Sequence, residues 1–383
     1  MIPYGRQHIT QQDIDAVIDV LQSDFLTQGP AVPAFETRFC ELTQAKHAIA
    51  VNSATSALHL ACLALDIGPG SRVWTSPVSF VASANCARYC GALVDFVDVE
   101  PDTGNMCIIA LRQKLEQART TDTLPQVVIP VHLAGLSCDM QQIYHLSKEF
   151  GFRIIEDASH AVGASYREQP VGSCQYSDIT VFSFHPVKII TTAEGGMALT
   201  CQAELAEKMR LLRSHGITRD EQQMTEPSHG DWYYQQLQLG FNYRMTDLQA
   251  ALGLSQSQRL LQIIQKRQLL AANYQRLLAD LPLSLPGSDP QCISAYHLYI
   301  IRLTDKQIRK QVFNSLRAAN IGVNVHYIPI HTQPYYQQLG FDWGDFPQAE
   351  EFYERIISLP MYPELTAEQQ QYIADILRES LAG

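Results

Sequence analysis

A single lysine between two strand-like segments is the residue of this sequence best suited to covalent chemistry. Lys188 ends the stretch Ser183-Phe-His-Pro-Val-Lys188, which follows a β-branched and aromatic run at 178–184 and precedes an apolar run at 197–200. The pattern places Lys188 on a connection between buried strands. A lysine held there with a lowered pKa can attack a carbonyl cofactor, because only the unprotonated amine forms a Schiff base. An ordinary surface lysine is the alternative interpretation, and the surrounding motifs distinguish between the two.

Hydroxyl groups follow another predicted strand, at 47–51. Ser53, Thr55 and Ser56 open an apolar helix there, where side-chain hydroxyls and free backbone N–H groups can bind a phosphate. Plain capping of the helix by serine or threonine is the structural alternative.

A carboxylate, an imidazole and an aromatic ring follow two further predicted strands. Asp157 and His160 come after the strand at 152–155, and Phe80 comes after the strand at 72–75. Ligands of parallel α/β sheets bind beyond the carboxyl ends of the strands, and Phe80 could stack on a flat ring there. A helix cap, a surface charge and a core phenylalanine are the corresponding structural alternatives.

The elements that must position these residues predict an α/β fold. Strand-like runs at 47–51, 72–75, 93–97, 127–131 and 152–155 alternate with helical patterns, which indicates a mostly parallel sheet with helices on both faces. A helix at 10–21 precedes them, with apolar residues at 14, 17, 18 and 21 on one stripe.

The C-terminal third has a different pattern. After a long helical pattern at 254–281, strands at 296–303 and 322–326 flank a helix at 306–319, which predicts an α+β unit. We therefore expect a large domain over residues 1–250, including the N-terminal helical arm, and a smaller one over 251–383.

Composition narrows the class of function. The 383 residues are 46% hydrophobic and 17% charged, with a net charge of −11, so we expect a globular protein that binds neither nucleic acid nor an anionic membrane. No signal peptide and no run of about 20 apolar residues is present, which favours the cytoplasm. The nine cysteines form no Cys-x-x-Cys pair, so we expect reduced thiols and no metal site. Nicotinamide binding is disfavoured because Gly68-Pro-Gly70 follows a helix and lacks the third glycine of the fingerprint.

Taken together, these segments resemble a known family, the DegT-type nucleotide-sugar aminotransferases, which are fold-type I enzymes dependent on pyridoxal 5'-phosphate (PLP). The resemblance covers nearly the whole chain. It rests on Asn52-Ser-Ala-Thr-Ser-Ala57, Glu156-Asp-Ala-Ser-His160, Ser183 to Lys188 with Glu194-Gly-Gly196, and Gly240-Phe-Asn-Tyr-Arg-Met-Thr-Asp-Leu-Gln-Ala250. Within the family the chain is most similar to the aminotransferases of pseudaminic acid biosynthesis, through Ile2-Pro-Tyr-Gly-Arg-Gln7, Asp24-Phe-Leu-Thr-Gln-Gly-Pro30 and Asn324-Val-His-Tyr-Ile-Pro329.

The resemblance implies a role for each matching residue. Lys188 would bind the PLP aldehyde, and Asp157 would pair with the ring nitrogen and keep it protonated. Further cofactor contacts would come from Thr55, Ser56, Phe80, His160, Ser183 and, across a homodimer, Asn242. Substrate contacts would come from Tyr4, Arg6, Thr27, Arg244, His326 and Tyr327.

The implied reaction is transfer of an amino group, expected from L-glutamate, to C4 of a UDP-linked 4-keto-6-deoxy-2-acetamido sugar. The product would be UDP-4-amino-4,6-dideoxy-N-acetyl-β-L-altrosamine. Three alternatives remain: a sister aminotransferase for another keto-sugar, a PLP-dependent dehydratase, and a non-catalytic protein of the same fold. Lys188 argues against the dehydratase, because that branch carries histidine there. One departure is Ala193, where the family often has glycine; a positive φ there would strain the backbone.

Overall fold

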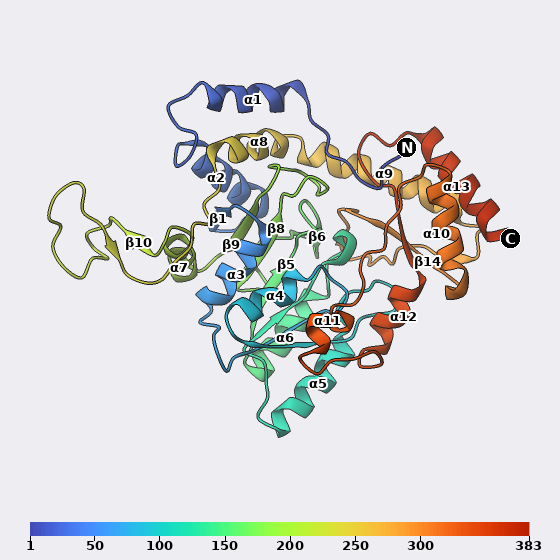
Figure 1. The fold of residues 1–383 in the computed structure, drawn as a ribbon, viewed down its shortest axis with the longest axis horizontal. Coiled ribbons are helices and arrows are strands. Elements are labelled where there is room, and N and C mark those ends of the chain that lie inside the picture. Colours follow the sequence, from blue (N-terminus) through green and yellow to red (C-terminus); the bar gives the residue numbers. More distant parts are fainter. Residues whose placement is uncertain (383) are drawn as a thin grey trace.

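A seven-stranded sheet forms the centre of the computed structural model, which describes residues 1–382 (Figure 1). The strand order is β1-β9-β8-β5-β4-β2-β3, and only β9 runs antiparallel to its neighbours. The strands are β1 (His47–Val51), β2 (Arg72–Thr75), β3 (Leu93–Phe96), β4 (Val127–Ile129), β5 (Arg153–Asp157), β8 (Ile179–Ser183) and β9 (Gly196–Thr200). The expected mostly parallel sheet is confirmed.

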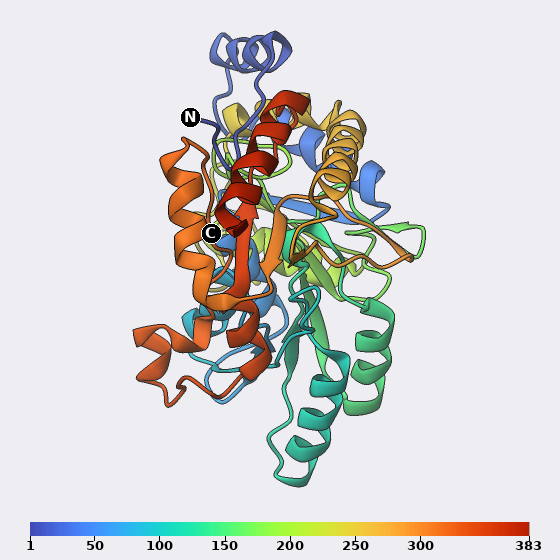
Figure 2. The same ribbon diagram turned by 90° about the vertical axis from the view of Figure 1, so that its right-hand side faces the viewer.

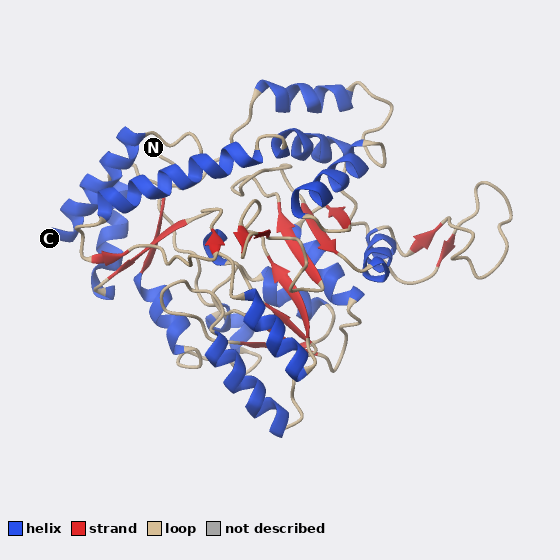
Figure 3. Ribbon diagram, turned by 180° about the vertical axis from the view of Figure 1, so that it is seen from behind, coloured by secondary structure: helices blue, strands red, loops and turns tan. Residues whose placement is uncertain are grey.

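Helices cover this sheet on both faces, as Figure 3 shows with strands in red and helices in blue. β8 and β9 are buried along their whole length, which parallel-sheet cores require of their central strands. The helices of this part are α2 (Ala31–Thr43), α3 (Ala54–Ala64), α4 (Ala82–Tyr89), α5 (Ile108–Thr120), α6 (Met140–Phe150), α7 (Ala203–Arg213) and α8 (Asp247–Ser257). Two small sheets accompany the large one: a two-stranded sheet of β10 (Ile217–Thr218) and β11 (Gln235–Gln236), and a three-stranded sheet of β13 (Cys292–Ile293), β6 (Ser165–Tyr166) and β7 (Gln169–Pro170).

The C-terminal elements form a second hydrophobic unit with its own sheet, of order β12-β14-β15. Figure 2 shows its orange and red helices along one side of the molecule. Its elements are α9 (Leu260–Leu278), β12 (Leu283–Ser284), β14 (Tyr299–Leu303), α10 (Arg309–Ala318), β15 (Ile356–Leu359) and α13 (Ala367–Ala382). The helices α11 (Pro334–Gln337) and α12 (Pro347–Arg355) come from the same part of the chain, but their buried residues Tyr336 and Phe352 pack in the core of the large sheet. Residue 250, the expected boundary, lies inside α8, which packs on α1 and α2.

The strand expected at 322–326 is wrong. β15 takes the place beside β14, and Asn324 makes only an isolated bridge to Ser358. The side chain of Asn324 also accepts a hydrogen bond from the backbone N–H of Val325 at 2.8 Å, a local bond that competes with a strand ladder.

Backbone hydrogen bonds hold the N-terminal residues against this second unit. The backbone N–H of Ile2 donates to Asn320 at 2.8 Å, and that of Met361 donates to the carbonyl of Tyr4 at 3.0 Å. The ring of Tyr4 lies 5.5 Å from that of His326. The first residues of the chain therefore form one wall of the space between the two units.

Helix α1 (Gln11–Leu21) attaches to the body through polar contacts, and it lies at the edge of the molecule in Figure 1. Asp13 is fully buried, and its carboxylate accepts hydrogen bonds from Ser255 at 2.6 Å and from Arg259 at 2.6 Å. The predicted apolar stripe faces outward, since Ile14 and Ile18 are 44% and 40% exposed. The helix was predicted correctly, but its apolar face has no partner among the described residues.

Ala193 has φ = 66°, the left-handed conformation that its sequence context raised as a source of strain. A non-glycine residue there costs about 1 kcal/mol. We expect Ala193→Gly to raise the free energy of unfolding by about 0.5–1 kcal/mol, measured by urea denaturation. Ala206→Gly, inside α7, is the matched control and should lower it instead. A loss of stability in Ala193→Gly would contradict this account.

Candidate active site

A cavity of about 580 Å³ lies beyond the carboxyl ends of the central strands, and it collects most of the predicted site residues. Its size is typical of sites for cofactors and small ligands. The predicted residues that line it are Tyr4, Thr55, Phe80, Asp157, His160, Ser183, Lys188, His326 and Tyr327. Residues far apart in the sequence therefore converge, as the resemblance implied.

Lys188 lies in a turn between β8 and β9, where its backbone N–H donates to the carbonyl of His185 at 2.9 Å. Burial lowers the pKa of Lys188 to about 8, although the negative charge of Asp157 acts in the opposite direction. About one amine in ten is then unprotonated at pH 7, which is several hundred times the fraction for an ordinary lysine. The amine is thus available as a nucleophile.

Asp157 ends β5 and is 5% exposed. Its Oδ2 accepts a hydrogen bond from Ser83 Oγ at 2.6 Å, and its Oδ1 accepts from Ser159 Oγ at 2.6 Å and from the Ser159 N–H at 3.1 Å. Both oxygens are therefore held. Neither serine was predicted as a site residue, and only Ser159, two positions after Asp157, could have been suspected from the sequence.

His160 and His326 are neutral hydrogen-bonding groups of the cavity. The Nδ1 of His160 accepts from the backbone N–H of Ala134 at 3.2 Å, so its Nε2–H faces the hydroxyl of Tyr327 at 3.1 Å. Burial, reinforced by the charge of Lys188, lowers the pKa of His160 well below its ordinary value and that of His326 to about 4. His326 Nδ1 lies 2.8 Å from Ser358 Oγ, which fixes the ring. Lys188 is then the strongest base of the cavity.

Sequence reasoning missed His297. It lines the same cavity, and its ring lies 4.4 Å from that of His160. Burial lowers the pKa of His297 well below its usual range. No signal in the sequence pointed to it, because His297 precedes β14 and ligands of α/β sheets bind beyond the carboxyl ends of the strands.

The N-terminus of α3 forms the opposite end of the cavity. Ser53 caps the helix by accepting the backbone N–H of Ser56 at 3.1 Å. A Cβ on Gly196 would lie 2.4 Å from the backbone nitrogen of Ala54, so only glycine allows β9 to begin this close to the helix. Free N–H groups and the positive end of the helix suit a phosphate.

Ser56 does not line the cavity. Its hydroxyl lies 2.7 Å from Asn52 Oδ1, to which it donates, and 3.0 Å from Ser53 Oγ. The hydroxyl of Ser56 is held by these two residues, and its contact with a phosphate stays a prediction, whereas Ser53, named with Thr55 and Ser56 as a possible phosphate ligand, does line the cavity.

Four other predicted residues also lie outside this chain's cavity. Arg6 is exposed and 3.8 Å from Glu364, and Asn242 is exposed. Thr27 and Arg244 form isolated bridges to Thr246 and Val51. None of these four side chains lines the cavity of its own subunit.

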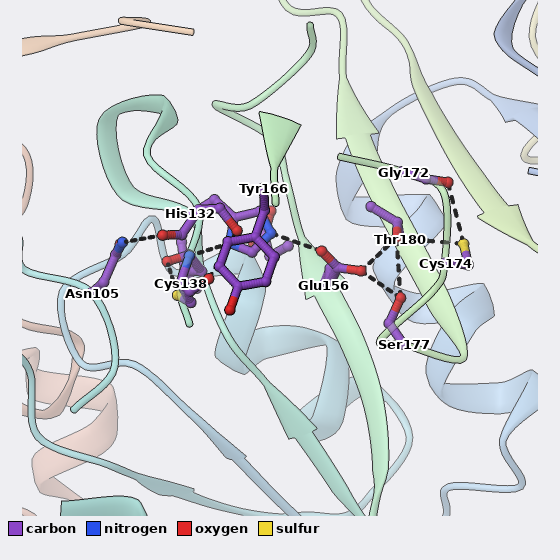
Figure 4. Close-up of polar contacts among 12 residues, drawn as sticks. Asn105, His132, Cys138, Glu156, Tyr166, Gly172, Cys174, Ser177 and Thr180 are labelled. Atoms are coloured by element: carbon purple, nitrogen blue, oxygen red, sulfur yellow. Dashed lines mark hydrogen bonds and ion pairs between the residues drawn. The ribbon is translucent and has the colours of Figure 1, made fainter. Parts of the chain in front are cut away.

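Behind Asp157, a buried polar network joins β4, β5 and β8 (Figure 4). Neighbouring strand residues face opposite sides of a sheet, so Glu156 points away from the cavity. His132 accepts the backbone N–H of Cys138 at its Nδ1 and donates from Nε2 to Glu156 at 2.8 Å. Burial opposes the charge of Glu156, but the hydrogen bonds from His132 and from Ser177 hold its pKa below its ordinary value. The network fixes the strand that carries Asp157.

These residues fit PLP. One cavity combines an amine of lowered pKa, a buried carboxylate, a helix N-terminus, and Phe80, whose ring is 58% exposed and available for stacking on the pyridine ring. Among residues 1–382, no group of three possible metal ligands occurs. No helix in that range is long and apolar enough to cross a membrane.

A family model decides the classification. The model of the DegT/DnrJ/EryC1/StrS aminotransferase family matches residues 7–378. The chain belongs to this family. DegT-family sugar aminotransferases depend on PLP, so this chain is a PLP-dependent sugar aminotransferase with their fold.

Individual proteins are also similar to the whole chain. The Bacillus subtilis spore coat polysaccharide biosynthesis protein SpsC is 39% identical, with 100% of this chain and 97% of SpsC covered. The Helicobacter pylori aminotransferase PseC, involved in the biosynthesis of pseudaminic acid, is 34% identical, with a TM-score of 0.90 and coverage of 100% and 99%. A Streptococcus pneumoniae protein provisionally named a sugar aminotransferase, in its PMP form, is 31% identical, with a TM-score of 0.91 and the same coverage.

Proposed function

We propose that this DegT-family enzyme transfers the amino group of L-glutamate to C4 of a UDP-linked 4-keto-6-deoxy-2-acetamido sugar in pseudaminic acid biosynthesis. The product would be UDP-4-amino-4,6-dideoxy-N-acetyl-β-L-altrosamine. The observation that carries the transamination is the meeting of Lys188 and Asp157 in one cavity. The choice of sugar is supported by the N-terminal and 324–329 motifs, whose Tyr4 and His326 form one wall, and by the similarity to PseC.

In this proposal the chain supplies binding, orientation and one mobile proton. Pyridoxal phosphate supplies an electron-withdrawing ring that accepts the electron pair released at a substrate carbon. Lys188 Nζ would hold the cofactor aldehyde and, once released, would carry a proton between the substrate carbon and carbon C4′ of the cofactor, taking it from one and giving it to the other. Asp157 keeps a proton on the ring nitrogen, and the neutral side chains of His326 and Tyr327 orient the sugar.

The test is amination by the purified, PLP-loaded enzyme. Glutamate is incubated with a panel of nucleotide-linked keto-sugars that differ in the configuration at C5 and in the nucleotide, and products are identified by mass spectrometry and NMR. We expect amination at C4 of the L-configured UDP-linked 4-keto-6-deoxy-2-acetamido sugar. Preferred amination of another sugar would establish a sister activity instead, an alternative favoured by the 39% identity to SpsC.

A homodimer with shared active sites is the assembly we propose. Thr27, Asn242 and Arg244 lie outside their own subunit's cavity, and the apolar stripe of α1 is exposed. Both observations are explained if a second copy covers α1 and receives these side chains. The hairpin β10–β11, which projects from the body in Figure 1, would extend the same contact.

We therefore expect Ile14→Glu/Ile18→Glu to convert the protein from dimer to monomer, because two buried charges would replace apolar contacts. Light scattering coupled to size exclusion measures the change as a twofold loss of mass. Ile109→Glu, at an isoleucine of α5 that is 68% exposed, is the matched control and should remain dimeric. A wild-type protein that is already monomeric would refute the assembly.

The cytoplasm is the compartment we propose. All nine cysteines are free in the structure. Free thiols that pair with no other cysteine are typical of reducing compartments. Treatment with a thiol reagent after denaturation should therefore label nine positions in the freshly isolated protein.

A further inference from the structure

The carboxylate of Asp157 is held from a second direction by a residue to which no role was assigned from the sequence. Ser83, on α4, is fully buried, and its hydroxyl lies 2.6 Å from Asp157 Oδ2. The two residues are 74 positions apart, so this contact is made by the fold and not by a local turn. On the other oxygen, Oδ1, the partner is Ser159.

The hydrogen-bond directions can be assigned from the number of protons available. An ionised carboxylate only accepts, so the single hydroxyl proton of Ser83 goes to Asp157. The hydroxyl of Ser79, 2.7 Å from that of Ser83 and also buried, must then donate to Ser83. The result is a directed chain from Ser79 to Ser83 to Asp157. Each donor polarises the next, and the exclusion of water strengthens the charge-assisted bond.

We propose that Ser83 is a positioning residue that, with Ser79 behind it, holds the Asp157 carboxylate in the orientation required to face the cofactor ring nitrogen. This proposal rests on the role given to Asp157 above. Without Ser83, Oδ2 loses its only hydrogen-bond donor among the described residues, and the carboxylate can turn about its broad terminal torsion. Ser79 directly precedes Phe80, so one loop sets both the ring-stacking residue and the carboxylate.

The experiment compares PLP with its 1-deaza analogue, which has carbon in place of the ring nitrogen. Equilibrium binding to the apoenzyme of wild type and variants is measured for both. We expect Ser83→Ala to weaken the binding of PLP about 10-fold and the binding of the analogue less than about 2-fold, because only the ring nitrogen of PLP pairs with the carboxylate. Ser79→Ala, one step removed, should weaken PLP about 3-fold. Ser83→Thr, which keeps the hydroxyl, should restore selective binding of PLP over the analogue.

Ser76→Ala is the matched control. Ser76 is fully buried in the same loop, but its hydroxyl accepts from the Val78 N–H at 3.2 Å and is not bonded to Asp157. The affinity of Ser76→Ala for PLP and for the analogue should equal that of the wild type. Equal weakening of PLP and the analogue by Ser83→Ala, or no weakening of either, would overturn the proposal. If Ser83→Ala does not fold, Ser79→Ala decides by the same comparison.

Asp157→Ala separates failure of this proposal from failure of the proposed function. If Asp157→Ala weakens the binding of PLP and of the analogue equally, the role of Asp157 itself is refuted. If Asp157→Ala weakens PLP binding selectively and Ser83→Ala does not, Asp157 keeps its role and only the positioning by Ser83 is refuted.

Discussion

The Lys188→Ala variant is expected to lose both turnover and the visible absorbance that PLP shows when it is attached to a lysine. In the proposed mechanism one side chain binds the cofactor aldehyde and also moves the proton, so its removal should abolish two steps. We expect turnover to fall about 10⁴-fold or more. Steady-state amination and the absorption spectrum of the PLP-saturated variant measure the two losses.

The exposed Lys46 offers the matched control, and Lys46→Ala should keep both properties. The pH dependence adds a further check. Because the pKa of Lys188 is lowered to about 8, the rate of PLP attachment to the wild type should rise with pH up to about 8 and then level off. Normal activity in Lys188→Ala would remove this residue from the mechanism.

Replacement of Asp157 should produce the second largest effect. An ion pair about 4 Å apart at an effective dielectric constant near 20 is worth about 4 kcal/mol before desolvation, which corresponds to about 10³-fold in rate. We expect Asp157→Ala to slow the half-reaction with glutamate by up to this factor, measured by stopped-flow absorbance.

Asp157→Asn tests whether the charge or the shape of Asp157 matters. It keeps the shape and loses the charge, so it should be slowed as strongly as Asp157→Ala. Asp15→Asn, at an exposed carboxylate of α1, is the control and should be unaffected. A half-reaction that runs at the wild-type rate in Asp157→Asn would refute the pairing with the ring nitrogen.

The parts of this site that could be predicted are those coded by short, contiguous patterns. Lys188 lies between two runs of strand-forming residues, and Asp157 follows a third, so their place at the carboxyl edge of the sheet follows from strand alternation. The alternation also predicted the parallel sheet itself. Family resemblance added the cofactor, and the stacking of Phe80 on its ring stays a prediction.

The other features of the site and the fold could not be predicted, because they depend on contacts between residues far apart in the sequence. Nothing near Ser83 indicates that α4 brings its hydroxyl to Asp157, and His297 was read only as the start of a strand. The segment 322–326 has strand-like residues, but β15 occupies the neighbouring position. For α1, periodicity identified the apolar face correctly, but Asp13 pairs with Arg259 and turns that face outward. The sequence pattern identifies the apolar face of a helix, but it does not show whether that face packs against the rest of the protein.

The hydrogen bonds that the first residues make with residues late in the chain have a consequence for synthesis on the ribosome. Ile2 bonds to residues 320–322, and the carbonyl of Tyr4 bonds to Met361. The amino-terminal wall of the cavity therefore cannot close until translation has passed residue 361 and that segment has left the exit tunnel. Until that segment has emerged, the nascent enzyme holds an unfinished pocket, so cofactor capture is expected to follow its emergence from the ribosome.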